Sequence, residues 1–118
     1  MICNRVLRGL IELLILCLLS KGEAHGYKLL KELARLTGRT VSVGTLYPML
    51  YRLEAEGLVR SFRVERDDGR TVRIYRITER GLRELERIRQ VFSSQLRWLF
   101  EELLQHPSAA EAPESPTA

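Results

Sequence analysis

The sequence has few of the residues that build a disulfide framework or a metal centre. Among its 118 residues are two cysteines, Cys3 and Cys17, and two histidines. The cysteines show no Cys-x-x-Cys spacing and have no histidine cluster beside them, which excludes the usual zinc patterns and a disulfide scaffold. We therefore expect no metal site and no cofactor, and we expect both cysteines to be buried, reduced thiols in a cytoplasmic protein.

A long uninterrupted hydrophobic run is also missing. The most apolar stretch, residues 10–19, contains Glu12 and falls well short of the roughly 20 residues that a membrane-spanning helix needs. Arg5 and Arg8 precede this stretch, as in a secretory signal peptide, but no small-x-small cleavage site follows it. We expect no membrane segment. A secreted chain stays an alternative, which the presence of residues 1–20 on the purified protein tests.

The third absence is a catalytic constellation. His25 and His106 are isolated in the sequence, no glycine-rich phosphate loop is present, and the carboxylates are spread along polar helix faces. We therefore expect that the protein is not an enzyme.

Arginine dominates the charge that is present. The formal net charge is +4, from 19 Lys plus Arg against 15 Asp plus Glu, and 16 of these cations are arginine. The surplus lies before residue 78, because residues 78–104 contain five cations and five anions. Arginine pairs well with phosphate and guanine. On charge alone, a nucleic-acid partner and an ordinary solvated surface both stay open.

Helical periodicity predicts three helices in the first half of the chain, over residues 6–20, about 25–37 and about 42–56. The first is apolar on most sides, so we expect it to be buried on most sides. Pro48 lies inside the third, where proline removes a helical hydrogen bond. That helix therefore begins either at Ser42 or at Pro48 itself.

The periodicity changes from helical to alternating after Gly57. Asp67-Asp68-Gly69 lies between two alternating, β-prone stretches, which is a strong hairpin signal. Arginines recur along both strands and the turn. The order of three helices and a basic hairpin is that of a winged helix-turn-helix, whose third helix enters the DNA major groove while the hairpin reaches the neighbouring groove or backbone.

A long amphipathic helix is expected over residues 78–104, with Thr78 as its N-cap. Its apolar stripe exceeds what a small winged domain can cover, so we expect it to form a homodimer interface rather than to fold back on its own domain. The residues expected in that interface are Leu85, Ile88, Phe92, Leu96, Leu99 and Leu103.

The expected fold class is mainly α with a small β-hairpin, namely a winged helix-turn-helix plus a long C-terminal dimerisation helix. Its expected parts are a DNA-binding domain over residues 1–77, the dimerisation helix over residues 78–104, and a disordered tail over residues 105–118, which is rich in Pro, Ala, Ser and Glu.

Residues 7–78 resemble the PadR family of bacterial transcriptional regulators. The matching motifs are Leu-Arg-Gly-x-x-Glu-Leu-x-Ile-Leu (7–16), His-Gly-Tyr (25–27), Val-Gly-Thr-Leu-Tyr-Pro-x-Leu-x-Arg-Leu-Glu-x-x-Gly-Leu (43–58) and Tyr-x-Ile-Thr-x-x-Gly (75–81). The resemblance implies that Pro48 lies within the recognition helix, which then begins at Ser42. The last helix matches only in type, as the single dimerisation helix of the smaller members.

We expect DNA contacts from the start of the second helix, which the resemblance adds, from the third helix and from the hairpin tip. These residues are Tyr27, Lys31, Ser42, Gly44, Thr45, Tyr47, Pro48, Tyr51, Arg52, Arg70 and Arg73. Arg52 fits a guanine or phosphate contact, but also a salt bridge involving Glu54 or Glu56. Thr45 fits a phosphate contact or a cap with Ser42, and Tyr47 fits a phosphate contact or packing. The hairpin arginines fit binding or a plain solvated loop.

The resemblance also implies a small aromatic or drug-like effector near the dimer interface. Trp98, the only tryptophan, fits stacking on it, with Leu7, Leu10 and Leu14 lining the site, but ordinary interface packing is the interpretation of Trp98 that we favour. The expected function is a homodimeric, sequence-specific DNA-binding repressor on a pseudo-palindromic operator in double-stranded DNA. The alternative is a winged-helix protein–protein adaptor, whose binding would depend little on salt.

Overall fold

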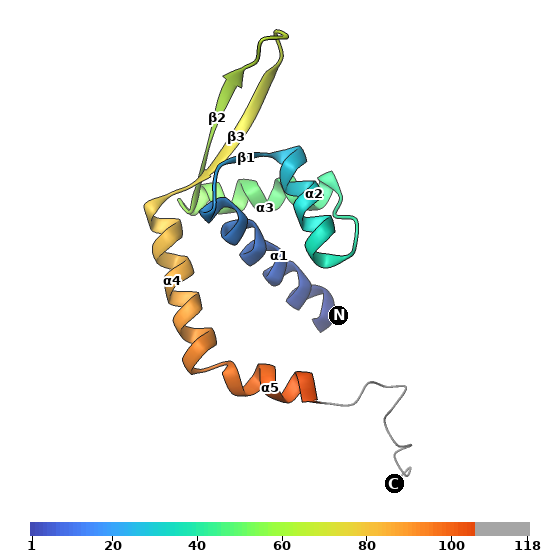
Figure 1. The fold of residues 1–118 in the computed structure, drawn as a ribbon, viewed down its shortest axis with the longest axis vertical. Coiled ribbons are helices and arrows are strands. Elements are labelled where there is room, and N and C mark those ends of the chain that lie inside the picture. Colours follow the sequence, from blue (N-terminus) through green and yellow to red (C-terminus); the bar gives the residue numbers. More distant parts are fainter. Residues whose placement is uncertain (106–118) are drawn as a thin grey trace. The chain divides into compact units, whose positions relative to one another are not determined.

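The computed structural model of the chain describes residues 1–105, and most of them are helical (Figure 1). This confirms a mainly α fold with a small β-sheet. The expected tail lies outside the described residues, apart from Gln105. The elements in chain order are α1 (Ile2–Ser20), β1 (Ala24–His25), α2 (Gly26–Thr37), α3 (Val43–Ala55), β2 (Val59–Glu65), β3 (Thr71–Ile77), α4 (Glu79–Ser94) and α5 (Arg97–Gln105). The described residues divide into two compact units, residues 1–86 and 87–105, with the boundary inside α4.

The first helix is buried only in its second half. Ile15, Leu16 and Leu19 are in the core of the first unit, whereas Val6 and Leu10 are exposed. The expectation that this helix is buried on most sides is therefore wrong for its first half, because the core of the winged unit covers only the last turns of α1. The same exposure makes the prediction of two buried thiols wrong, since Cys3 is exposed and Cys17 is only partly buried.

The next two helices end and begin at the residues that the sequence indicates. Gly38 closes α2 in the left-handed conformation, with φ +69°. The Ser42 side chain caps α3, and Pro48 lies inside this helix, which confirms a start at Ser42. Because proline has no N–H, the carbonyl of Gly44 loses its usual helical donor there.

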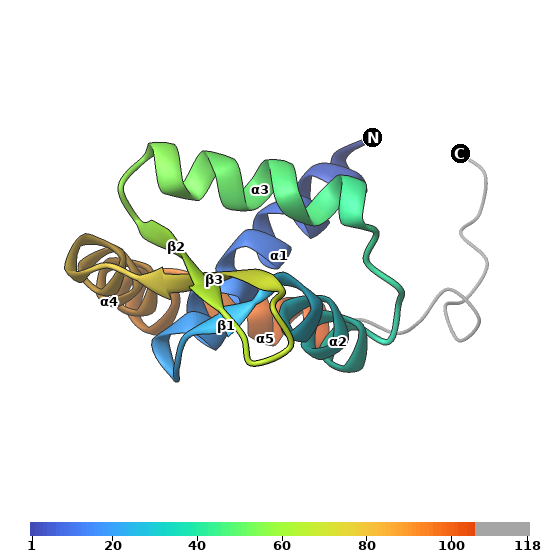
Figure 2. The ribbon, with the colours of Figure 1, turned by 90° about the horizontal axis from the view of Figure 1, so that it is seen from above.

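The sheet has three antiparallel strands in the order β1-β3-β2. Strands β2 and β3 form the expected hairpin, the wing, around a turn in which Gly69 has φ +81°. The two-residue strand β1 pairs Ala24 with Tyr75 and was not expected, because two residues are too few to show an alternating pattern. In Figure 2, α3 lies on one side of the winged unit and the hairpin projects beside it.

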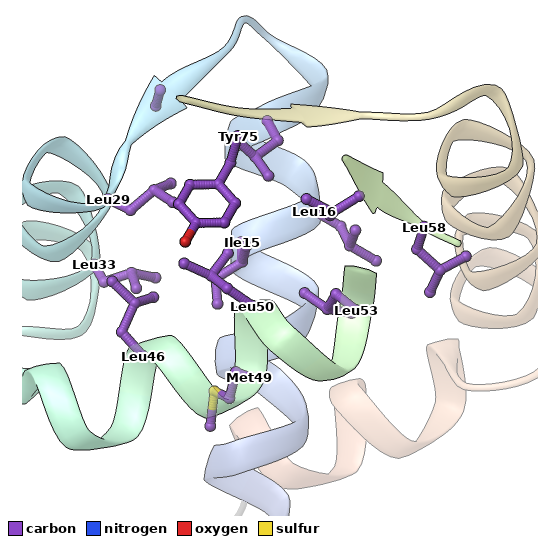
Figure 3. Packing of buried hydrophobic residues seen from close by; sticks show 13 residues of the cluster. Ile15, Leu16, Leu29, Leu33, Leu46, Met49, Leu50, Leu53, Leu58 and Tyr75 are labelled. Atoms are coloured by element: carbon purple, nitrogen blue, oxygen red, sulfur yellow. The ribbon is translucent and has the colours of Figure 1, made fainter. Parts of the chain in front are cut away.

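The core of the first unit joins all three of its full helices to the sheet (Figure 3). Burial of each such apolar side chain contributes roughly 1.5–3 kcal/mol relative to leaving it exposed. The most deeply buried side chains of this core are Ile15, Leu19, Leu29, Leu33, Leu46, Leu50 and Val59.

One threonine joins the end of the wing to the next helix. The Thr78 hydroxyl donates to the carbonyl of Gly57 (2.6 Å) and accepts from the N–H of Gly81 (3.0 Å), while the Thr78 N–H donates to the Leu58 carbonyl (3.0 Å). Gly81 packs so closely on the Leu58 carbonyl and the Ile77 side chain that a Cβ at this position would overlap them. These contacts explain the threonine and the glycine of the Tyr-x-Ile-Thr-x-x-Gly motif.

The expectation of one uninterrupted helix over residues 78–104 is wrong. Helix α4 ends at Ser94 and α5 begins at Arg97. The hydroxyls of Ser93 and Ser94 both donate to the carbonyl of Gln90, at 3.2 and 2.6 Å, and such back-bonding bends helices. The heptad stripe therefore does not run along one straight helix. No helix within residues 1–105 is both long and apolar enough to cross a bilayer.

Candidate DNA interface

The third helix has a buried face and an exposed face, as its helical wheel predicts. Leu46, Met49, Leu50 and Leu53 are buried. The expected outward residues of the DNA-contact set are all exposed, and Tyr51 is 76% exposed. These residues are Gly44, Pro48, Tyr51 and Arg52. One face of α3 is therefore exposed from Gly44 to Arg52.

The two hydroxyls at the start of α3 are bonded to each other. The Ser42 Oγ accepts a hydrogen bond from the Thr45 N–H (3.2 Å) and lies 3.0 Å from the Thr45 Oγ1. Ser42 thus satisfies one of the free amides of the first turn. For Thr45, this geometry is that of the cap with Ser42, one of its two alternatives. Ser42 itself is exposed, so its side chain is accessible to an anion at the start of the helix.

Tyr47 packs against the beginning of α2. Its hydroxyl lies so close to Gly26 that a Cβ at position 26 would overlap it, yet the Tyr47 side chain is 41% exposed. Tyr47 therefore packs against α2 with part of its side chain, as the packing alternative predicts. The exposed part of the side chain is still accessible to a phosphate. The contact with Gly26 does not follow from the sequence, because no local spacing connects the His-Gly-Tyr motif with Thr-Leu-Tyr-Pro. Close by, burial raises the pKa of the Tyr75 phenol, and Tyr47 raises it further.

At the start of α2, two expected contact residues lie together. The Lys31 Nζ is 5.6 Å from the centre of the exposed Tyr27 ring, in cation–π geometry. The His25 ring stacks on the Tyr27 ring, with ring centres 6.4 Å apart, and the His25 Nδ1 accepts from the Lys28 N–H (3.1 Å). His25 is isolated in the sequence, whereas in the structure it is the cap of α2.

Arg52 forms a salt bridge, although with neither of the glutamates considered from the sequence. Its Nη1 lies 3.1 Å from the Oε1 of Glu12 on α1, and the two side chains are 59% and 27% exposed. Arg52 therefore connects α3 to α1 while more than half of its side chain stays exposed.

Two arginines of the wing differ in their attachment. Arg73 Nη1 donates to the Ser61 Oγ (2.8 Å), and this hydroxyl in turn donates to the Glu54 Oε1 (2.6 Å). Arg70, at the hairpin tip, is highly exposed and lies 3.8 Å from Asp68. Arg73 is thus tied to the recognition helix, whereas Arg70 is held only within its own turn.

Strand register places one further arginine beside Arg73. Arg63 is its direct antiparallel partner, so both side chains lie on the same face of the hairpin. Arg76 belongs to the opposite face, where it bonds Glu23 (2.7 Å) and covers the Phe62 ring. Arg63 was absent from the expected contact residues, although strict alternation along β2 and β3 could have identified it.

The expected effector residues fall in both units. Leu7, Leu10 and Leu14 of α1 line one groove of about 570 Å³ together with the α2–α3 loop and the first residues of α3. Trp98 belongs to the second unit and is 69% exposed on α5.

The expected dimerisation residues have unequal exposure. Leu85 is partly buried against the core of its own winged unit, so it is not wholly free for a partner chain. Within the second unit, Phe92 packs against Phe100 with ring centres 5.3 Å apart, whereas Leu99 and Leu103 are exposed. Among residues 87–105, α5 therefore carries apolar side chains that its own unit does not cover, as interaction surfaces do.

Comparisons with known proteins agree with this geometry. The sequence model of the transcriptional regulator PadR-like family matches residues 15–87. Transcriptional regulator Rv3488 of Mycobacterium tuberculosis is 49% identical over 75 residues, which are 63% of this chain and 67% of that protein.

Solved structures give the same result over more of the chain. A PadR-like transcriptional regulator from Bacillus cereus is similar with a TM-score of 0.74 and 31% identity, covering 87% of this chain and 99% of that one. The protein TA0346 from Thermoplasma acidophilum is similar with a TM-score of 0.77 and 32% identity, covering 88% and 99%. With its family match over more than half its length and this fold, the chain belongs to the PadR-like family of transcriptional regulators.

Proposed function

We propose that this protein is a sequence-specific DNA-binding repressor that acts as a homodimer on a pseudo-palindromic operator in the cytoplasm. The observation that carries the proposal is the exposed face of α3 from Gly44 to Arg52, which follows a capped helix start and lies in the same winged unit as an arginine-bearing hairpin. A helix presented in this way fits the major groove, and the wing fits the adjacent backbone.

The roles proposed for individual residues follow their positions. Gly44, Tyr47, Pro48, Tyr51 and Arg52 face the base edges or the groove walls. The hydroxyls at the start of α3, the Tyr27–Lys31 pair and the wing arginines contact phosphates, which position the helix without reading sequence. In a dimer the two recognition helices enter successive major grooves, roughly 34–36 Å apart.

The test is selection of binding sites from a random duplex pool, together with the mass of the protein in solution at two salt concentrations. We expect an enriched inverted repeat, bound by a dimer and weakened at high salt, because phosphate contacts release counterions. No enrichment, with partner binding that is insensitive to salt, would contradict the proposal and favour a protein–protein adaptor.

We also propose that a small aromatic or drug-like molecule regulates this binding. The α1 groove supports this, because its volume suits a small molecule and its walls include Ser42 and Thr45 at the start of the recognition helix. Trp98 is the only tryptophan, so its emission can be followed while planar aromatic compounds are added. Saturable quenching that also lowers operator affinity is expected, and quenching unchanged by Leu10→Glu would place the ligand away from this groove.

A further inference from the structure

We propose that Glu54 and Ser61 are positioning residues that hold Arg73 ready for a DNA phosphate where the wing meets the recognition helix. This inference rests on the DNA-binding function proposed above. It adds that the Arg73 side chain is oriented toward a phosphate before DNA binds. It concerns three side chains from α3, β2 and β3.

The hydrogen bonds among these residues have a fixed direction. The Glu54 Oε1 accepts from both the N–H (3.0 Å) and the hydroxyl (2.6 Å) of Ser61. Because an ionised carboxylate can only accept, the single hydroxyl proton of Ser61 points toward Glu54. The hydroxyl oxygen is then free to accept from Arg73 Nη1, at 2.8 Å. The carboxylate on the recognition helix thereby orients an arginine on the wing.

The hydrogen bonds from Arg73 to Ser61 and from Ser61 to Glu54 form a relay, and its position suits a DNA phosphate. Ser61 pairs with Tyr75, and Arg63 pairs with Arg73, so all of these side chains share the face of the hairpin on which Tyr75 is buried. Like charges directly opposite each other on paired strands are unfavourable. Within residues 1–105, neither Arg63 nor Arg73 forms an ion pair, so the two guanidinium groups lack an anion that a phosphate would supply.

The relay also leaves Arg73 able to bind. Its bond to Ser61 uses one guanidinium nitrogen, and the remaining N–H donors can form a bidentate contact with a phosphate. A long side chain that is already ordered loses less conformational entropy when it binds. Arg70 at the hairpin tip lacks such a connection to α3, so the relay distinguishes Arg73 from Arg70, the other wing arginine of the expected contact set.

The experiment measures operator affinity over a range of salt concentrations for the full-length protein and for variants at positions 61 and 73. Arg73→Ala removes one phosphate contact from each subunit of the proposed dimer, so it should lower the slope of log affinity against log salt by about 1.8, which is about 0.9 per contact. Ser61→Ala should weaken binding about three- to tenfold, as expected for one hydrogen bond, and leave the slope unchanged because Arg73 still reaches the phosphate. Added to Arg73→Ala, Ser61→Ala should have no further effect.

Matched variants separate positioning from general stability. Arg63 lies opposite Arg73 but has no bond to Ser61, so the effects of Arg63→Ala and Ser61→Ala should multiply. Ser61→Thr keeps the hydroxyl and should retain wild-type affinity. Glu54→Ala removes the acceptor of both Ser61 bonds and should weaken binding in the wild-type but not in the Arg73→Ala background.

If the effects of Ser61→Ala and Arg73→Ala on affinity multiply, the two residues act independently and the relay is wrong. The proposed DNA-binding function would still stand in that case, because the unchanged protein binds its operator. Absence of DNA binding by the unchanged protein would overturn the proposed function and this role for Arg73 together.

Discussion

At the scale of single residues, consecutive charged side chains of the recognition helix face different neighbours. Arg52 bonds Glu12 on α1, and Glu54 bonds Ser61 on the wing. A salt bridge between partly exposed side chains contributes only about 0–1 kcal/mol to stability. The value of such contacts is therefore in the orientation of α3 more than in the free energy of folding.

This exposure leads to a prediction for Arg52. Arg52→Ala should weaken operator binding by about 1–3 kcal/mol, with relaxed preference at one base position if Arg52 reads a base and uniform weakening if it contacts a phosphate. Binding-site selection with the variant distinguishes the two results. Glu12→Gln is the control, because it removes the salt bridge and leaves the guanidinium in place. If both variants lower stability equally and neither changes DNA affinity, Arg52 is an anchor only.

A second prediction concerns the contact between Gly26 and Tyr47. Gly26→Ala should destabilise the protein by up to about 1–3 kcal/mol, because a Cβ at this buried position would overlap the hydroxyl and outer ring atoms of Tyr47 and displace its side chain. Tyr47→Phe should recover part of this loss, since the hydroxyl is the nearest atom. Urea unfolding of the single and double variants measures both effects.

Gly9 is the matched control for that experiment. It also lies in a helix, but a Cβ there would meet nothing within 4 Å. Gly9→Ala should be neutral or stabilising by up to about 1 kcal/mol, because alanine favours helix more than glycine does. Equal destabilisation by both alanines would refute the proposed overlap.

At the scale of elements, the cap of α3 carries two roles that substitutions can separate. Ser42→Ala should cost about 1 kcal/mol of stability through loss of the hydrogen bond to Thr45. Ser42→Asp keeps a good cap and should preserve stability, yet its negative charge at the expected phosphate site should weaken DNA binding. Ser42→Asn keeps the cap without that charge. Thermal unfolding and DNA titration of the three variants give the comparison, and full affinity in Ser42→Asp would argue against a phosphate at this position.

The elements also show what could be predicted from the sequence. Gly38 at the end of α2, the Asp-Gly turn and the buried face of α3 depend on residues within a few positions of one another, so local patterns were sufficient. Contacts such as Arg52 with Glu12 and Tyr47 with Gly26 join residues tens of positions apart, and their partners follow only from tertiary packing. The break after Ser94 coincides with a local feature, the serine hydroxyls that donate to the Gln90 carbonyl. A prediction based on apolar periodicity does not take such hydrogen bonds into account.

At the scale of the whole molecule, assembly is the property that the exposed face of α5 indicates. Leu103→Glu should convert the proposed dimer into a monomer and weaken binding to an inverted repeat, because it puts a charge on an apolar surface. Sedimentation and DNA titration measure the two effects. Gln105→Glu adds the same charge on the same helix and should change neither. A Leu103→Glu protein that stays dimeric would show that the interface lies elsewhere.

The hydrogen bonds of Thr78 determine how firmly α4 is attached to the end of the wing. This residue is the only link between the last residue of β3 and the first of α4, and its hydroxyl and amide are both bonded to the loop that ends α3. These three hydrogen bonds restrict rotation between β3 and the first turn of α4. If the winged unit shifts on its proposed DNA site, the first turn of α4 should move with it, so Thr78 is a stiff connection and not a hinge.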